Sequence, residues 1–537
     1  MKPMDATNGF GVWNYVVFAT VLAISASIGL YYRFTGGKQK TTQEYLLADG
    51  NMSIIPVAFS LMASFMSAIS LLGASKEIYS FGTEYILINF GYLVGIPIAA
   101  YGFLPVFFKM KNTSVYEYLE LRFGVFARLA ASISFSIQMI LYMGIVLYSP
   151  ALTLSVVTGI SKLGAVLSVG LVCTFYSTLG GMKAVLLTDV FQVIVMFAAI
   201  YSVFIKGTID AGGFNIVWDI AKEGGRIELF DFNPDPTVRH TFWTLTIGGM
   251  FTCLSLYAVN QAQVQRSLTV KGIILPLYVM DSMSHIPGLP GLFVAGIFSG
   301  ALSTISSAVN SLAAVTMEDY LKPFLAYFKI SPLTNKKSTI ITKFFALLYG
   351  LLCIGIAFMT EHLGGVLQAA LTIFGVVGGP LLGLFTLGLF FWIANETGAV
   401  VGLLFGLAIS FWIGFGGPKP PLPYLPVSTD GCNATESPLL AFNHETLDIE
   451  RTEEEHYFVL YRISYLYTVV IGFLLTVLVG LLVSVIKQMV RPEPESFINP
   501  DFYSPFVRRI IPTKRIKTSK NESTISSVKE ESVAERF

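Results

Sequence analysis

The chain has 537 residues, of which 54% are hydrophobic and only 13% charged, a balance that a water-soluble globular protein does not carry. The net charge of +1 gives no sign of nucleic-acid binding, because the basic residues lie in loops and form no basic face. The four cysteines, Cys173, Cys253, Cys353 and Cys432, are too far apart in sequence to suggest a metal site or a disulfide framework.

Apolar stretches of about 20 residues, the length of helix that crosses a bilayer, recur along nearly the whole chain. The first, at 12–32, lacks a basic leader and a small-residue cleavage site, so we interpret it as a retained span and not a signal peptide. We expect an all-α polytopic membrane protein with twelve visible spans, at about 11–32, 53–75, 83–108, 124–149, 158–179, 186–207, 238–261, 286–316, 338–362, 365–393, 397–416 and 457–487.

The polar segments 208–237 and 417–456 are predicted to be loops. The tail that follows the last span is charged and rich in Ser and Thr, which is typical of disorder. We therefore expect a transporter domain at 1–490 and a disordered cytoplasmic tail at 491–537, whose final residues could dock a PDZ-type domain.

The distribution of lysine and arginine among the loops predicts an extracellular N-terminus, because the cytoplasmic loops of membrane proteins carry an excess of positive charge. Basic loops follow the first, third and seventh expected spans, and contain Arg33, Lys38, Lys40, Lys109, Lys111, Arg266 and Lys271. The next basic loop follows the eighth span and falls on the wrong side; it contains Lys322, Lys329, Lys336 and Lys337. The glycosylation sequon at Asn433 and the basic tail then fall on the wrong sides as well.

One missing span between Lys271 and Ile286 would repair all three violations. The intervening segment 272–285 is too short, and too interrupted by Pro276 and Asp281, to be that span. A re-entrant segment and a miscounted helix are the alternatives, but too few apolar residues are present for either. We therefore predict that one helix is absent from this chain.

Long and specific sequence blocks lie within the region from Trp13 to about Val485. They read SFMSAISLLG at 64–73, TSVYEYLELRF at 113–123, GGMKAVLLTDVFQV at 180–193, RHTFWT at 239–244, VNQAQVQR at 259–266, PGLPGLFVAGIFSGALSTISSAVNSLAAVTMEDYLKP at 287–323 and GVVGGPLLGLF at 375–385. In these blocks the chain resembles the sodium/solute symporter family. Within the family the chain resembles the branch of the multivitamin, monocarboxylate and iodide symporters, and the multivitamin type most of all.

This resemblance implies a broken-helix symporter fold: thirteen spans, an external N-terminus, a cytoplasmic C-terminus and two inverted five-helix repeats. The repeats would lie at about 53–207 and 238–393, flanked by extra N- and C-terminal helices. The second repeat would lack its second helix, where the loop charges also place a gap. The family's substrate and ion sites lie at mid-membrane, where helices are broken.

The stretch 299–311, SGALSTISSAVNS, carries hydroxyls inside an apolar run, and positions 299, 303, 306, 307 and 310 share one helical stripe. Helix packing and bonds back to the same helix would use such residues, and spacing alone favours that reading. Sodium, a hard cation, would also prefer these oxygen ligands. The resemblance favours sodium, and implies a site made of Ser303, Ser306 and Ser307 with the backbone carbonyls of Ala63 and Met66.

Asp189 is an acidic residue at the start of an apolar stretch, where a solvated helix cap is one interpretation and a cation role the other. Its place in the family block implies an indirect attraction for sodium, without direct ligation. Sodium, as the coupling ion, is the only ion we expect, with no cofactor. No motif of an enzyme is present: there is no phosphate-binding loop and no paired histidine.

The resemblance implies that Ser70, Tyr142, Cys253 and Gln368 face the substrate. The sugar-transporting branch has an acidic–amide pair where this chain has Ile69 and Ser70, which argues against sugar. The iodide and monocarboxylate transporters carry a tryptophan where Cys253 stands, so a roomier site for a carboxylate such as biotin or pantothenate is favoured. A short monocarboxylate or iodide is the alternative substrate.

The implied function is sodium-coupled uptake of an organic anion across the plasma membrane. Two other classes stay open: a carrier of the major facilitator type, which would need both termini in the cytoplasm, and a non-transporting isoform that lacks one helix. Asn433 would be glycosylated only in the repaired topology. In relatives the missing region includes an external cysteine, so the resemblance implies that Cys432 lacks a disulfide partner in this chain.

Lys76 is expected to attract the anion at the outer vestibule. The branch usually has an arginine where this chain has Ser80, and Lys76, four residues earlier, lies on the same helix face. Replacing Lys76 with alanine should therefore raise the substrate concentration that gives half-maximal uptake. An unchanged half-maximal concentration would show that Lys76 is only a solvated helix end.

Overall fold

The computed structural model describes residues 12–35, 41–48, 52–65, 67–110, 113–158, 161–269, 289–331, 333–359, 366–426, 457–491, 499–508 and 510, and in these it is helical without strands. The longer helices are α1 (Val12–Phe34), α3 (Ile54–Phe65), α4 (Ala68–Phe81), α5 (Ile88–Ile98), α8 (Val125–Thr158), α9 (Lys162–Asp210), α10 (Phe214–Glu223), α11 (Phe242–Tyr257), α13 (Leu289–Val315), α15 (Asn335–Met359), α16 (Val366–Phe390), α17 (Glu396–Phe415) and α19 (Thr468–Val490).

Short helices connect these or extend them. They are α2 (Thr42–Leu47), η2 (Thr83–Leu87), η3 (Ala99–Phe103), α6 (Leu104–Met110), α7 (Glu117–Arg122), α12 (Gln261–Ser267), η4 (Thr316–Leu321), α14 (Lys322–Tyr327), α18 (Val459–Arg462), η7 (Tyr465–Tyr467), η8 (Pro500–Phe502) and α20 (Pro505–Arg508). Two of them, η3 and η4, are π-helical turns inside longer helical runs.

The expectation of an all-α polytopic membrane protein is confirmed. Among the described residues, ten helices are long and apolar enough to cross a membrane, and α11 with α12 forms an eleventh. The twelfth expected span corresponds to α3 and α4, two helices that flank Met66, which lies outside the described residues. Each of the twelve expected spans thus has a counterpart in the structure.

Three spans or span pairs are interrupted inside the bundle. α3 ends at Phe65 and α4 begins at Ala68. The axes of α11 and α12 differ by 63° across a short break, where the Asn260 side chain caps α12 by accepting from the Ala262 amide at 3.0 Å. α9 turns at Gly181, whose φ of 59° and ψ of −165° form a conformation that only glycine adopts readily.

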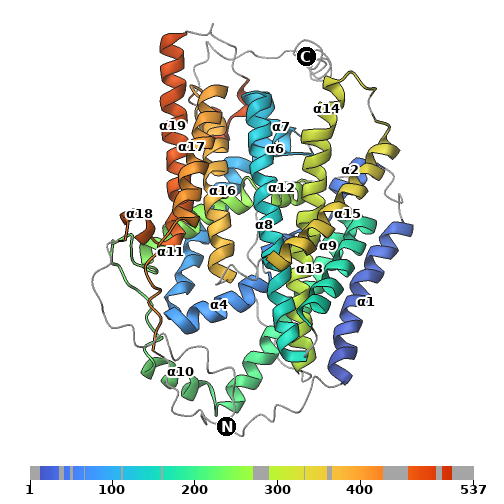
Figure 1. Ribbon diagram of the computed structural model, residues 1–537, viewed down its shortest axis with the longest axis vertical. Coiled ribbons are helices and arrows are strands. Elements are labelled where there is room, and N and C mark those ends of the chain that lie inside the picture. The colour runs from blue at the N-terminus through green and yellow to red at the C-terminus, as the bar shows by residue number, and fades with distance from the viewer. Residues whose placement is uncertain are drawn as a thin grey trace.

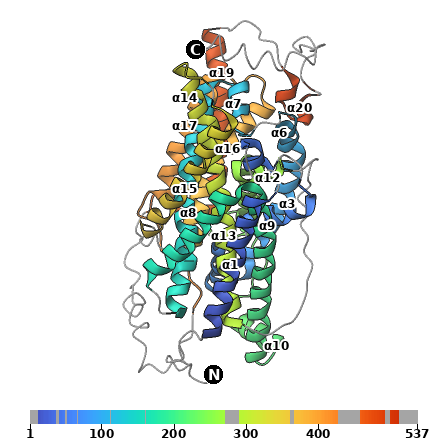
Figure 2. The same cartoon turned by 90° about the vertical axis from the view of Figure 1, so that its right-hand side faces the viewer.

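α13 is the central helix of the bundle (Figure 1). All residues of its apolar, membrane-length segment are buried (100%), whereas only 17% of the corresponding residues of α1 are buried. α13 contacts α3, α8, α9 and α15, and Figure 2 shows α1 alongside α9 and α13. The abundance of Ser, Ala and Gly in α13 suits this position, because small side chains let helices approach closely in a membrane.

The expected deletion falls outside the described residues. In Figure 1 α13 rises from the α10 end of the bundle into α14 at the opposite end. Residues 270–288, where we expect the missing span, precede α13 and lie outside the part of the chain that the structure describes.

The close crossing of α5 and α11 provides a stability test. A Cβ atom added to Gly91 would lie 2.4 Å from the Thr246 carbonyl oxygen and 2.5 Å from the Met250 amide nitrogen, both of them backbone atoms. Gly91→Ala should therefore destabilise the protein by about 1–3 kcal/mol through overpacking. The measurement is thermal unfolding of the purified chain in detergent.

Gly355→Ala on α15 is the matched control, because a Cβ atom there would meet nothing within 4 Å. Its unfolding midpoint should equal that of the parent chain or exceed it slightly, since alanine favours helix. Equal midpoints for the two variants would mean that α5 and α11 are not packed as closely as described.

Candidate functional site

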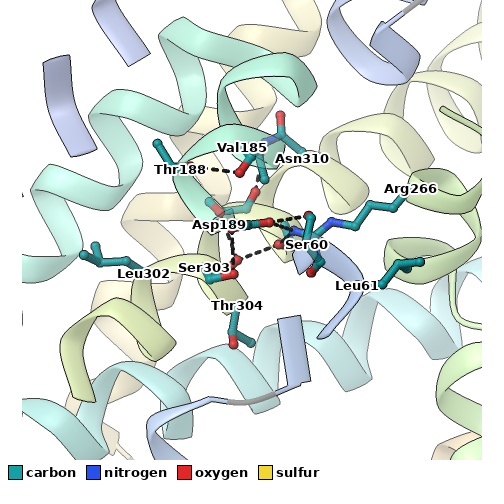
Figure 3. A network of polar contacts seen from close by, with 12 residues as sticks. Ser60, Leu61, Val185, Thr188, Asp189, Arg266, Leu302, Ser303, Thr304 and Asn310 are labelled. Carbon is teal, nitrogen blue, oxygen red and sulfur yellow. Dashed lines mark hydrogen bonds and ion pairs between the residues drawn. The ribbon is translucent and has the colours of Figure 1, made fainter. Parts of the chain in front are cut away.

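The Asp189 carboxylate on α9 lies fully buried at a point where four helices meet. The Ser303 hydroxyl of α13 donates to Oδ1 at 2.6 Å, and the Ser60 hydroxyl of α3 donates to Oδ2. The Arg266 guanidinium of α12 lies 2.9 Å from Oδ2 (Figure 3). A buried carboxylate needs such partners, because an unpaired charge in low dielectric is costly.

The structure excludes one alternative for Asp189 and corrects the expected position of Arg266. Asp189 is not a solvated helix cap: it lies two turns beyond Gly181, inside the helix, with no exposed surface. Arg266 is not part of a basic cytoplasmic loop: it belongs to α12 and is itself fully buried. The charge count missed the pairing of these residues, because a partner distant in sequence allows both charges to be buried.

Ser303, Ser306 and Ser307 are all buried on α13. The hydroxyls of Ser306 and Ser307 donate to the Ser303 carbonyl at 2.9 and 2.5 Å, which is the back-bonding that the packing interpretation requires. Ser307 also contacts the Arg266 guanidinium, and Ser303 donates to Asp189. The stripe therefore combines helix packing with a polar cluster, and the two interpretations do not exclude each other.

Further buried oxygens lie on the helices of this cluster. Among the described residues, five side-chain oxygens on α9, α12 and α13 are buried without a hydrogen-bond partner: Thr178 Oγ1, Gln192 Oε1, Gln263 Oε1, Ser299 Oγ and Asn310 Oδ1. Buried polar atoms are rarely left without a partner. Neutral oxygens, such as these on the helices that hold the carboxylate, are the ligands that a hard monovalent cation prefers.

The broken end of α3 supplies backbone oxygens to the same region. Ala63 is 1% exposed and packs on Val193 and Met196 of α9, one and two turns beyond Asp189. The last carbonyls of a helix have no partner within that helix, so a break makes them available to a ligand. Met66, the other residue whose carbonyl oxygen is predicted to bind sodium, lies outside the described residues.

α12 is a fully buried polar helix that ties this region together. The Gln261 amide donates to the Thr113 carbonyl at 2.8 Å, and the Gln265 amide donates to the Leu46 carbonyl at 2.9 Å. Arg266 donates to the Ser60 carbonyl at 2.7 Å. α12 therefore holds three segments that are distant in sequence: the end of α2, the middle of α3 and the segment that precedes α7.

The predicted substrate residues belong to four different helices, α4, α8, α11 and α16. Tyr142 on α8 is hydrogen-bonded to Ser67 at the α3–α4 break, and its ring centroid lies 4.5 Å from that of Phe374 on α16. Cys253 packs toward α5, where a Cβ atom on Gly95 would lie 3.0 Å from the Cys253 Cβ. Gln368, on α16, accepts from Arg239 at 3.3 Å. Nothing is described of the Ser70 side chain.

A second buried ion pair, between Glu77 and Arg239, joins α4 to the segment just before α11. We call this pair and its polar neighbours the Arg239 cluster; its members are Glu77, Arg239, His240, Gln368 and Tyr465. Arg239 donates to Glu77 Oε1 at 2.9 and 2.6 Å, and its guanidinium carbon lies 4.1 Å from the Phe81 ring centroid. Through Gln368 and Tyr465 the cluster also reaches α16 and η7.

The charge of the cluster resides on Glu77 and Arg239. His240 Nε2 lies 3.2 Å from the same carboxylate oxygen that Arg239 contacts, so the imidazole adds a further polar contact to the pair of Glu77 with Arg239.

Sequence reasoning singled out Asp189, but it did not recognise Arg266, Arg239 or Glu77 as members of buried ion pairs. Arg266 ends the block VNQAQVQR and Arg239 begins the block RHTFWT, so both were inside matched motifs. Lys76, which we chose for anion attraction, is exposed, while its neighbour Glu77 is buried. The missed signal was the position of single arginines at the ends of apolar spans, where a buried partner is required.

Among the described residues, no group of three or more His, Cys, Asp or Glu side chains could hold a metal ion. A cation at Asp189 would therefore be held mainly by neutral oxygens, which suits sodium better than a transition metal. Asn433 and Cys432 lie outside the described residues.

The Arg239 cluster predicts a charge-removal cycle. Arg239→Gln alone should lower the stability of the purified protein by about 3–5 kcal/mol, because Glu77 would be left buried and unpaired. Adding Glu77→Gln to this variant should recover part of the loss. The measurement is the thermal unfolding midpoint in detergent. Additive losses in the double variant would contradict a buried pair.

Comparisons with known proteins agree with this architecture. The family model described as the sodium:solute symporter family matches residues 45–272 and 237–406. A protein of Drosophila melanogaster that carries the provisional name sodium-dependent multivitamin transporter is 51% identical over 510 residues, covering 86% of this chain and 84% of its own. The human sodium-coupled monocarboxylate transporter 1 is 44% identical over 535 residues, covering 87% of each chain.

The alignments are 510 and 535 positions long, but they cover only 86% and 87% of the 537 residues of this chain. Both alignments therefore contain positions at which the relative has a residue and this chain has none. The solved structure of a Na+-coupled sialic acid symporter, in a substrate-bound outward-open state, has the same fold with a TM-score of 0.71 and 23% identity. It covers 89% of this chain and 98% of its own. The chain belongs to the sodium:solute symporter family.

Proposed function

We propose that this chain carries a vitamin-type carboxylate, such as biotin or pantothenate, into the cell together with sodium. The chain is a transporter of the sodium-coupled solute symporter class and not an enzyme. Plasma-membrane location, an external N-terminus and a cytoplasmic C-terminus belong to the proposal, and the orientation requires the missing helix. The higher identity to the relative named for multivitamins supports the substrate.

The observation that carries the proposal is the bond between Asp189 and Ser303. It brings α9 and α13 together, and α9 also packs against Ala63 of α3, which supports a sodium site at this position. Ser303, Ser306 and Ser307 with the carbonyls of Ala63 and Met66 would bind sodium. The negative charge of Asp189, which contacts the serine hydroxyls, would offset the positive charge of the sodium ion. The cation would therefore not be buried without a counter-charge.

The substrate would lie between the α3–α4 break and α16, where Tyr142 contacts both Ser67 and Phe374. Ser70 and Gln368 belong to the elements that flank this position. Cys253 would act indirectly, by setting the spacing between α11 and α5. The Arg239 cluster would close one end of the pathway, because it joins α4 to α16, and alternating access requires such contacts to open and close.

The energetics suit accumulation of an anion. If two sodium ions entered with one monovalent anion, one positive charge would move inward, and a potential of about 60 mV would supply about 1.4 kcal/mol. A tenfold sodium gradient would add about 1.4 kcal/mol for each of the two sodium ions. The sum of about 4 kcal/mol could hold roughly a thousandfold substrate gradient.

Sodium-dependent uptake tests the substrate and the integrity of the chain. Cells expressing this chain, beside cells expressing a version with the missing helix restored, would be given labelled biotin, pantothenate or lactate in sodium or choline medium. We expect uptake of a vitamin in sodium medium by the restored version. Preference for lactate would favour the monocarboxylate alternative, and uptake by neither version would refute the transport assignment.

Ser303→Ala tests the sodium site, with Ser311→Ala as the matched control. Both serines are buried on α13, but the Ser311 hydroxyl donates only to the Ser307 carbonyl, at 2.8 Å. Losing Ser303 should raise the sodium concentration for half-maximal uptake by about tenfold or more, because a bond to a buried charge is lost. Equal sodium dependence in the two variants would disprove the site.

A further inference from the structure

Arg266 places a positive charge inside the region proposed for sodium. The side chain has no exposed surface and comes from α12, while its contacts lie on three other helices. One guanidinium nitrogen donates to the Ser60 carbonyl at 2.7 Å, and another lies 2.9 Å from Asp189 and contacts the Ser307 hydroxyl. Figure 3 shows the guanidinium between Ser60 and Asp189.

These acceptors overlap with the proposed sodium ligands. Ser307 is one of the ligands, and Asp189 is the carboxylate that would offset the ion's charge. Ser60 lies one turn before Ala63, on the helix whose broken end supplies the carbonyls. A guanidinium and a sodium ion would thus seek the same oxygens, and both would serve as the counter-ion of one carboxylate.

Binding two cations in this region at once is electrostatically unfavourable. With Arg266 in contact, the buried charges of Asp189 and Arg266 cancel; with sodium added, the ion would face the guanidinium at short range in a low-dielectric environment, where like charges repel strongly. Without either cation, Asp189 would be left buried and unpaired. The site is therefore best satisfied by one cation at a time.

We propose that Arg266 is a tethered cation that occupies the coupling-ion site when sodium is absent, and that sodium binds by displacing it. This proposal rests on the sodium site of the proposed function. The position of α12 then follows from the occupant of the site, because Gln265 and Arg266 attach the same helix to α2 and α3. Sodium shifts the bundle toward states in which α12 is released.

The tethered cation also has a role in the transport cycle. A carrier must return across the membrane without sodium and substrate, and an uncompensated carboxylate at mid-membrane would oppose this step. Arg266 neutralises Asp189 during the return. Net uptake requires the return step, whereas exchange of internal for external substrate at saturating sodium does not.

The test is sodium-dependent thermal stabilisation of the purified full-length chain in detergent, with choline replacing sodium at constant ionic strength. Arg266→Gln should reach half-maximal stabilisation at a sodium concentration about tenfold lower than the parent chain, because the competing charge is gone. Arg266→Lys, which keeps the charge, should stay close to the parent. An unchanged or higher sodium requirement in Arg266→Gln would overturn the proposal.

Arg128→Gln is the matched control for loss of a buried arginine. Arg128 pairs with Asp319 and Glu120 and contacts none of the sodium-site residues. Its variant should unfold at a lower temperature with an unchanged sodium requirement. If Arg266→Gln does not fold, Arg266→Lys decides the question: a sodium requirement about tenfold lower in that charged variant would refute the tethered cation.

Two outcomes separate this proposal from the proposed function. Sodium-specific stabilisation that appears only after Arg266→Gln would support the tethered cation, since the parent site would then be held closed by its own arginine. The absence of sodium-specific stabilisation from the parent and from every variant would reject the sodium site itself, and the tethered cation with it.

Discussion

Asp189 on α9 is the one buried charge on which the centre of the structure depends, because its oxygens are shared by Ser60 of α3, Ser303 of α13 and Arg266 of α12. A carboxylate in a membrane interior is tolerated only while such partners surround it. Four helices must therefore keep their relative positions. This requirement accounts for the complete burial of both α12 and the serine stripe of α13.

Helix breaks supply the rest of the polar surface. α3 ends before Met66 and α12 is bent away from α11, so both expose backbone groups that a continuous helix would satisfy internally. The side chains of α12 satisfy several of these groups, and a cation would satisfy others. Binding and helix position are therefore coupled through the same hydrogen bonds, which is what a transporter that alternates between two states requires.

Hydropathy predicted the spans well, because every membrane-crossing helix needs a long apolar stretch whatever its neighbours are. The stripe at 299–311 was also predictable, since its period is a property of one helix. The pairing of Asp189 with Arg266, and of Glu77 with Arg239, was not: each joins segments far apart in sequence. The close approach of Cys253 on α11 to Gly95 on α5 was not predictable either, because it also joins segments far apart in sequence.

Equilibrium binding of radioactive sodium to the purified full-length chain tests the central claim most directly, namely that the oxygens around Asp189 form the coupling-ion site. We predict saturable binding that is weakened by Ser303→Ala and by Asp189→Asn and retained by Ser311→Ala. Saturable binding of unchanged affinity in all three variants would place the ion elsewhere and contradict the account.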